Sequence, residues 1–182
     1  MKRKILMGLT ISLIASLFFM GCNKTVDDNK ESSVKSEVQV EKSDFGAKEA
    51  ISDNNLNLEK MLRYAIEDEF LARSEYEAII EKFGQVKPFT NIIKAEEKHI
   101  SMLKDLYSKY NYKIPEDNSK DHIIIPQNLN DSFKAGVNAE IDNIAMYDKF
   151  LKQDIPDDIK KVFVELRDAS KNHLSAFQKN VK

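Results

Sequence analysis

Apolar side chains recur at steps of three and four residues in four segments of the chain. Residues at that spacing lie on one face of an α-helix, so each segment is typical of an amphipathic helix with one buried side. Gly84 is a favoured residue just past a helix end, and Pro88 is a favoured residue in a first helical turn. The pattern predicts helices at about residues 56–83, 88–110, 130–151 and 156–181.

The connections between these helices are unequal in length. Residues 85–87 and 153–155 are so few that each connection must join two antiparallel neighbours. A much longer stretch, 111–129, separates the two pairs and contains Pro115 and Pro126. Two antiparallel hairpins joined by one long crossover form the ferritin-like topology. The sequence therefore predicts an all-α fold, a four-helix bundle of the ferritin-like kind.

Some positions are expected to be structural or exposed. The run of three isoleucines at 123–125 is expected to hold the crossover against the bundle, with His122 beside it as an ordinary exposed loop residue. In the first helix, the adjacent Glu67 and Asp68 are expected to belong to a solvated face.

The first 22 residues have the organisation of a secretory targeting segment. Basic residues at 2–4 precede an apolar stretch, 5–20, that is short for a membrane-spanning helix. The segment ends at Gly21-Cys22, which resembles the lipobox of bacterial lipoproteins. The resemblance implies that residues 1–22 are a signal peptide, that Cys22 carries the lipid, and that the domain is lipid-anchored to the membrane outside the cytoplasm. An uncleaved N-terminal anchor is the alternative. Because Cys22 is the single cysteine, no internal disulfide can form.

Residues 23–54 are rich in charged and small polar side chains and show no sustained apolar period. Such a segment buries too little surface to offset its ordering entropy, so we expect a flexible tether before a folded domain at 55–182. A short helix near 45–51 is the alternative. The formal net charge of the chain is −2, and basic residues are not clustered, which argues against nucleic acid as a partner.

Each predicted helix interrupts its own apolar face with polar residues near its middle. Buried carboxylates are costly unless they are paired or bind a metal, and several in one layer would repel each other. Glutamate and histidine ligands suit iron, manganese or zinc. The interrupting residues are Glu69, Glu96, His99, Glu140, Ser170 and His173.

A weak internal repeat relates the two predicted hairpins. In the first helix of each hairpin a glutamate is followed seven residues later by a tyrosine: Glu69 by Tyr76, and Glu140 by Tyr147. In the second helix of each, Glu96-x-x-His99 is echoed by Ser170-x-x-His173. This repeat fits a site with pseudo-twofold symmetry. Both tyrosines are expected to be core residues with hydrogen-bonded hydroxyls.

Two of these motifs resemble those of the rubrerythrins. Glu69-x-x-Ala-Arg-x-x-Tyr76 is similar to their first-helix motif, and Glu96-x-x-His99 to their Glu-x-x-His motif. The segment 170–177, Ser-Lys-Asn-His-Leu-Ser-Ala-Phe, is similar to a pattern of a bacterial family of ferritin-like domains of unknown function, family 2202. The resemblance covers roughly 56–180 and implies a metal-binding bundle.

The resemblance has departures as well. Ser170 stands where a second Glu-x-x-His motif would have its glutamate, and Asn143 stands where rubrerythrins have a further carboxylate. The rubredoxin-like iron module, which needs four cysteines, is absent from this sequence. The expected centre, with Ser170 and Asn143 beside it, therefore has three carboxylates and two histidines and could hold two metals or one.

Two functions are compatible with the sequence. The first is a metalloprotein with a di-iron or mononuclear iron site, or with manganese or zinc in place of iron, that could react with oxygen or peroxide. The second is a metal-free surface bundle that binds a partner or serves a structural role. A homodimer is possible, and no electron donor is indicated. Each candidate ligand also has a plainer interpretation. Glu96 and His99 could form a pair on the surface, and Glu69 could contact Arg73 on the same helix. Ile141 could occupy the core position instead of Glu140, and His173 could be hydrogen-bonded to Ser170.

Overall fold

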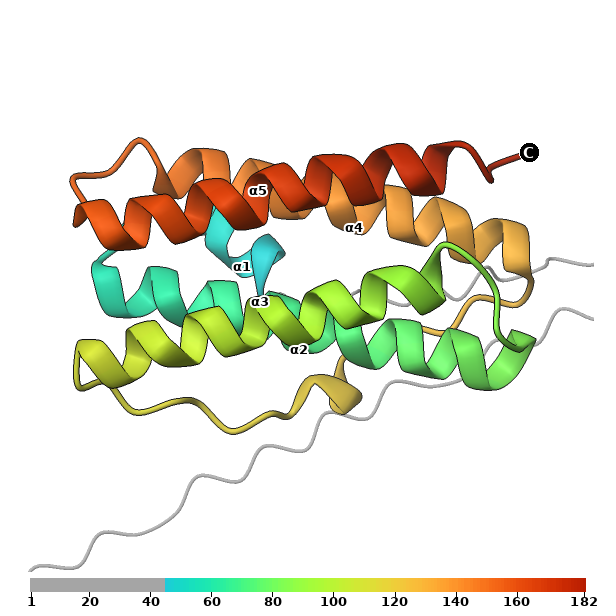
Figure 1. Ribbon diagram of the computed structural model, residues 1–182, viewed down its shortest axis with the longest axis horizontal. Helices are drawn as coiled ribbons and strands as arrows, with labels where there is room; N and C mark the ends of the chain where they lie inside the picture. The colour runs from blue at the N-terminus through green and yellow to red at the C-terminus, as the bar shows by residue number, and fades with distance from the viewer. Residues whose placement is uncertain (1–44) are drawn as a thin grey trace, which may run out of the picture. The chain divides into compact units, whose positions relative to one another are not determined.

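The computed structural model describes residues 45–182, and the predicted signal peptide and most of the predicted tether lie outside this range. Four long helices form the bundle, which confirms the predicted all-α architecture (Figure 1). They are α2 (Leu58–Phe83), α3 (Phe89–Lys109), α4 (Leu129–Phe150) and α5 (Asp157–Gln178), with a short α1 (Ala47–Ser52) before them and a 3₁₀ turn, η1 (Ser119–Asp121), in the crossover.

The connections set the directions of the helices. α2 and α3 form one antiparallel hairpin, and α4 and α5 form the other (Figure 1). The crossover between α3 and α4 returns along the length of the bundle, so that these two helices run in the same direction. This is the ferritin-like arrangement that the long connection predicts. In residues 45–182, no helix is long and apolar enough to cross a membrane.

Local signals account for where the long helices begin and end. The side chains of Asn57 and Asn128 accept hydrogen bonds from the backbone N–H groups of Lys60 and Asp131, both at 2.9 Å. These caps satisfy amides that have no partner within the helix. Gly84, with φ of 86°, ends α2 in a conformation that a side chain would disfavour.

The buried apolar side chains form two clusters along the bundle. The larger includes Leu62, Leu103, Phe150 and Phe163, and the smaller includes Tyr76, Phe89 and Phe177. Burying an aliphatic or aromatic side chain of this size stabilises a fold by about 1.5–3 kcal/mol. The buried polar residues near the middle of each long helix therefore lie within a bundle that apolar packing holds closed.

The folded part of the chain begins earlier than predicted. Phe45, Ala47 and Ala50, which were expected in the tether, are only 7, 2 and 0 % exposed. The ring of Phe45 stacks on His122 with a centroid distance of 4.1 Å, so His122 is not an ordinary exposed loop residue. Glu49 pairs with the guanidinium of Arg63 at 2.9 Å. α1 confirms the alternative considered above, a short helix near 45–51, which the sequence did not favour because its apolar residues show no sustained period.

Polar contacts hold the crossover on α2. Ser119 is fully buried, and its hydroxyl lies 2.8 Å from that of Ser74. Arg73 pairs with Asp117 of the crossover, so the contact of Glu69 with Arg73 considered above is wrong. Of the three isoleucines expected to hold the crossover, Ile124 and Ile125 are each 38 % exposed, whereas Ile123 is half-buried.

Candidate metal centre

The polar residues that interrupt the four helices meet in one buried layer. Glu69 comes from α2, Glu96 and His99 from α3, Glu140 from α4, and His173 from α5, and none is more than 9 % exposed. Ile141 is 48 % exposed, so Glu140 and not Ile141 occupies the core position. The structure brings all five predicted ligands together, while their binding of a metal stays a prediction.

The five residues form two triads that share Glu96. In the first triad, the Nδ1 atom of His99 lies 2.9 Å from Glu96 Oε2 and 3.1 Å from Glu69 Oε2. In the second, the Nδ1 atom of His173 lies 3.3 Å from Glu96 Oε1 and 3.5 Å from Glu140 Oε1. Within each triad the potential ligand atoms lie within 4.8 Å of one another. Glu96 thus directs one carboxylate oxygen to each histidine.

The two tyrosines of the internal repeat cross between the hairpins. Tyr76 of α2 donates a hydrogen bond to Glu140 Oε1 of α4 at 3.0 Å. Tyr147 of α4 donates one to Glu69 Oε1 of α2 at 2.8 Å. Each tyrosine therefore orients the carboxylate that belongs to the other hairpin. Both hydroxyls are hydrogen-bonded in the core, as predicted.

Ser170, which stands where a second Glu-x-x-His motif would have its glutamate, begins a chain of hydrogen bonds. The Ser170 hydroxyl donates to Asn143 Oδ1 at 2.6 Å, and Asn143 Nδ2 donates to Asp68 Oδ2 at 2.7 Å. The other oxygen of Asp68 accepts the backbone N–H of Ala47 at 2.8 Å. Ser170 is thus bonded to Asn143 and not to His173, so the hydrogen bond between Ser170 and His173 considered above is wrong.

Asp68 was missed by the sequence interpretation. Glu67 and Asp68 were expected on a solvated face, but Glu67 is 6 % exposed and pairs with Arg63 at 2.9 Å. Asp68 bonds across the bundle to Asn143, which was itself singled out as a polar residue one turn after Glu140. A buried asparagine needs a partner, and that requirement is the one sequence signal that could have pointed to a carboxylate on the facing helix.

Burial and charge shift the pKa values of the layer in opposite directions. Burial alone would lower the pKa of His99, but the charges and hydrogen bonds of Glu69 and Glu96 outweigh it and raise the pKa to about 10. His173, beside Glu140 and Glu96, has its pKa raised to about 9 against the same effect of burial. Burial, together with the charge of Glu96, raises the pKa of Glu69 to about 7.

The pKa of Glu96 shifts in the opposite direction. Burial would raise its pKa, but the adjacent imidazoles of His173 and His99 outweigh burial and lower it. The central carboxylate is therefore ionised between two protonated imidazoles. In this state the protons on the two histidines balance the negative charge that a cation would otherwise balance.

The residues fit a bound cation. The donor set consists of carboxylate oxygens and imidazole nitrogens, which suits first-row transition metals. In addition, Nδ1 of His173 is buried but makes no hydrogen bond of good geometry, although two carboxylates lie within 3.5 Å of it. A buried polar atom without a hydrogen bond is rare and calls for an explanation such as an ion.

Comparison with known proteins agrees with this arrangement. Residues 60–181, about two thirds of the chain, match the rubrerythrin family. The chain belongs to the rubrerythrin family. The chain is also similar to the uncharacterized protein MJ0754 of Methanocaldococcus jannaschii, with 30 % identity over 128 residues. The aligned region covers 61 % of this chain and 68 % of that relative.

The crystal structure of the same archaeal protein, described as hypothetical protein MJ0754, superposes on this rubrerythrin-family domain with a TM-score of 0.62. The match covers 71 % of this chain and 83 % of that chain at 25 % sequence identity. The relative's name records no activity, so the comparison supports the helical fold and the family but not a reaction.

Proposed function

We propose that this chain is a metal-binding protein whose rubrerythrin-like domain holds iron between its two hairpins. Glu69, Glu96 and His99 would hold one ion, and Glu96, Glu140 and His173 would hold another or complete a single site. The observation that carries this proposal is the pair of buried triads that share Glu96, in which the sharing carboxylate faces both histidines.

The surrounding residues favour a centre whose carboxylates are held in place. Tyr76 and Tyr147 each hold one terminal carboxylate by a hydrogen bond from the facing helix, which limits its rotation. Tyr147 belongs to the larger apolar cluster and Tyr76 to the smaller one, so apolar packing flanks the centre on both sides. Bound iron would supply one-electron transfer to oxygen or peroxide. Ser170 adds no charge where a fourth carboxylate would stand, so we expect slower oxidation than in a centre with six protein ligands.

The proposed location is the outer face of a membrane. The basic residues, the apolar stretch and Gly21-Cys22 support a lipid on Cys22 and an extracytoplasmic, lipid-anchored domain. Labelled palmitate should be incorporated into the wild-type chain and not into the Cys22→Ala variant. Equal labelling of both chains would contradict the anchor and would leave the metal proposal unaffected.

Metal analysis of the full chain tests the central proposal. The chain is freed of metal with a chelator, offered ferrous iron without oxygen, separated from free iron and analysed. We expect one to two iron ions per chain in the wild type and in Glu97→Gln, because Glu97 is an exposed neighbour. Glu96→Gln, a change of the same size and charge one residue earlier, should abolish retention. Iron-free wild type would contradict the proposal and favour a metal-free bundle that binds a partner or has a structural role.

A further inference from the structure

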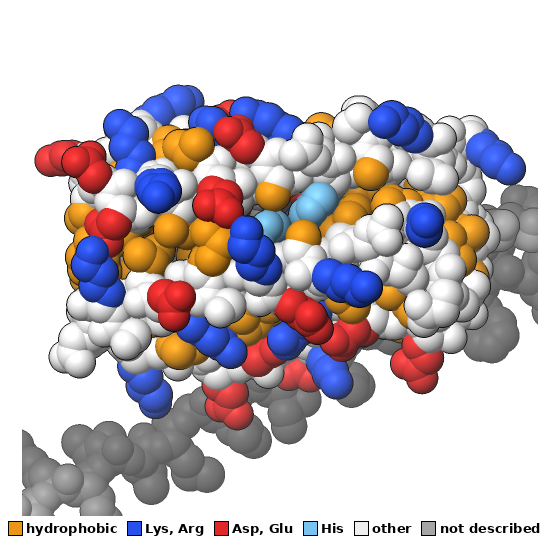
Figure 2. Space-filling view, viewed as in Figure 1, with side chains coloured by type: hydrophobic (Ala, Val, Ile, Leu, Met, Phe, Trp, Pro, Cys, Tyr) orange, Lys and Arg blue, Asp and Glu red, His pale blue; other side chains and the backbone are white. Residues whose placement is uncertain are grey.

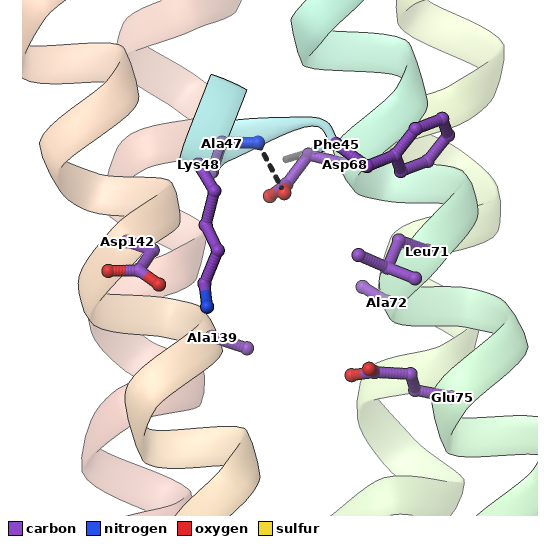
Figure 3. Close-up of a pocket in the computed structure, with 9 residues that line it drawn as sticks. All are labelled: Phe45, Ala47, Lys48, Asp68, Leu71, Ala72, Glu75, Ala139 and Asp142. Carbon is purple, nitrogen blue, oxygen red and sulfur yellow. Dashed lines mark hydrogen bonds between the residues drawn. The ribbon is translucent and has the colours of Figure 1, made fainter. Parts of the chain in front are cut away.

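Two neighbouring cavities lie along the seam between α2 and α4. The outer one is lined by residues of α1, α2 and α4, including Lys48, Asp68 and Asp142 (Figure 3). The inner one has space on the scale of a single water molecule and is lined by the predicted ligands Glu96 and Glu140. Three residues line both cavities, namely Asp68, Ala72 and Ala139.

The shared wall consists of two small side chains and one carboxylate. The side chains of Ala72 and Ala139 are single methyl groups, which leaves space in the seam. The Asp68 carboxylate is held in place by Ala47 from one side and by Asn143 from the other. Asp68 therefore stands at the junction between the outer cavity and the ligands.

α1 lies over the outer end of this seam. Figure 3 shows Lys48 reaching from α1 into the space between α2 and α4, toward which Asp68 and Glu75 of α2 also point. Gly46 brings the backbone close to α2, because a Cβ atom at this position would lie 2.7 Å from Asp68 Oδ1. The segment before α2 thus forms part of the wall.

The charges along the seam favour a cation. Glu75 and Asp142 line the outer cavity against the single ammonium group of Lys48, and the carboxyl group of Asp68 adds oxygen atoms to the same wall. A cleft of predominantly one sign raises the local concentration of ions of the opposite charge. Carboxylate oxygens can also replace some of the water ligands of a divalent ion as it leaves bulk solvent.

We propose that the seam between α2 and α4 is the route by which divalent metal ions reach the centre. This inference rests on the metal-binding function proposed above. The other side of the layer, between α3 and α5, offers a competing route because histidine side chains reach the surface there (Figure 2). On that side the side chains of His99 and His173 are 6 and 11 % exposed, and the experiment below distinguishes the two routes.

Substitutions along an entry route and substitutions of a ligand have different effects on the rates of metal binding and release. An obstruction along the path raises the barrier for entry and exit equally, so association and dissociation slow by the same factor. The equilibrium dissociation constant, which depends only on the free and bound states, stays unchanged. A substitution that alters the ligands themselves changes that constant.

The experiment measures binding of cobalt(II) to the metal-free full chain by stopped-flow absorbance, and its release by mixing with excess chelator. Ala139→Leu and, independently, Ala72→Leu should slow both rates by the same factor. Ala145→Leu, on an exposed position of α4, is the matched control and should leave both rates unchanged. Lys48→Ala should speed association by up to about tenfold at low salt, with a smaller gain at high salt.

The outcomes separate this proposal from the one on which it rests. If the wild type binds no cobalt, the metal-binding function fails. If it binds cobalt and neither leucine variant changes the rates, the route is overturned and entry between α3 and α5 takes its place. A changed equilibrium constant with an unchanged association rate would also overturn the route, because these positions would then act on the bound state.

Discussion

The two hairpins of this protein are nearly equivalent in fold and unequal in chemistry. Each supplies a glutamate, a tyrosine seven residues later, and a histidine on its second helix. The hairpin of α2 and α3 adds Glu96 three residues before its histidine, whereas the hairpin of α4 and α5 has Ser170 there. The first hairpin thus contributes three of the five candidate ligands and the second contributes two.

This difference changes what surrounds each histidine. His99 has two carboxylate oxygens within 3.1 Å, while those nearest His173 lie at 3.3 and 3.5 Å. Ser170 points instead into the chain of hydrogen bonds that leads through Asn143 to Asp68. A duplicated backbone arrangement therefore does not imply two equal half-sites, and one carboxylate serves both.

The largest effect should follow from removing that shared carboxylate. Glu96→Ala should weaken metal binding at both half-sites by more than the roughly 10- to 100-fold that loss of a supporting hydrogen bond costs, because a ligand itself is lost. Ser170→Ala should change the affinity much less. Competition with a coloured chelator measures both constants. If Glu96→Ala still binds one ion strongly, Glu96 is not a ligand shared by the two half-sites.

The pH dependence of the metal-free protein should distinguish the two histidines. Unfolded histidine has a pKa of about 6.5, and the folded values are raised to about 10 for His99 and about 9 for His173. A raised pKa contributes stability that is fully present below pH 6.5 and is lost as pH rises through the folded value. Glu69, with its pKa raised to about 7, acts in the same direction at lower pH.

Thermal melts between pH 6 and 10 should therefore show a falling melting temperature without metal, by an amount on the order of several kcal/mol in unfolding free energy. Bound metal should reduce this fall, since it takes the place of the protons. Ring-proton NMR should place the midpoint for His173 below that for His99. Equal midpoints near pH 6.5 would show that the carboxylates do not control the two rings.

How far the site could be predicted depended on the length of each pattern. The long helices were predictable because their apolar periods extend over many turns, and Glu69, Glu96, His99, Glu140 and His173 stood out as interruptions of those periods. α1 could be given only as an alternative to the tether, because its two buried alanines make too short a pattern. Asp68 was not predictable, because its partner Asn143 lies 75 residues away and only the packing of α2 against α4 brings them together.

Restoring the missing carboxylate should make the hairpins more alike. Ser170→Glu adds a fourth acid to a buried layer of like charges, so the metal-free protein should melt at a lower temperature than Ser170→Gln, the neutral control of the same size. With metal the order should reverse. At a hundred times its dissociation constant, each additional bound ion stabilises the fold by about 2.7 kcal/mol.

Metal titrations followed by calorimetry would count the ions in both variants. We expect two ions per chain in Ser170→Glu. If Ser170→Gln gains as much metal-dependent stability as Ser170→Glu, the added side chain acts through packing and not as a ligand. That result would leave the first triad as the principal site.

The smallest expected effect concerns the exchanged tyrosines. Tyr76 bonds to Glu140 and Tyr147 to Glu69, so each phenylalanine substitution removes one hydrogen bond to a carboxylate of the opposite hairpin. Such a bond contributes about 1.5–3 kcal/mol at most, and part of that loss should appear as weaker metal binding.

A double-mutant cycle tests which hairpin each tyrosine acts on. Tyr76→Phe should couple with Glu140→Gln by at least about 0.5 kcal/mol. It should be additive with Glu69→Gln, although Glu69 and Tyr76 lie on the same helix. The reverse should hold for Tyr147→Phe. Coupling within a helix instead of across the bundle would show that the two carboxylates are oriented by their own hairpins, and that the crossed hydrogen bonds do not organise the centre.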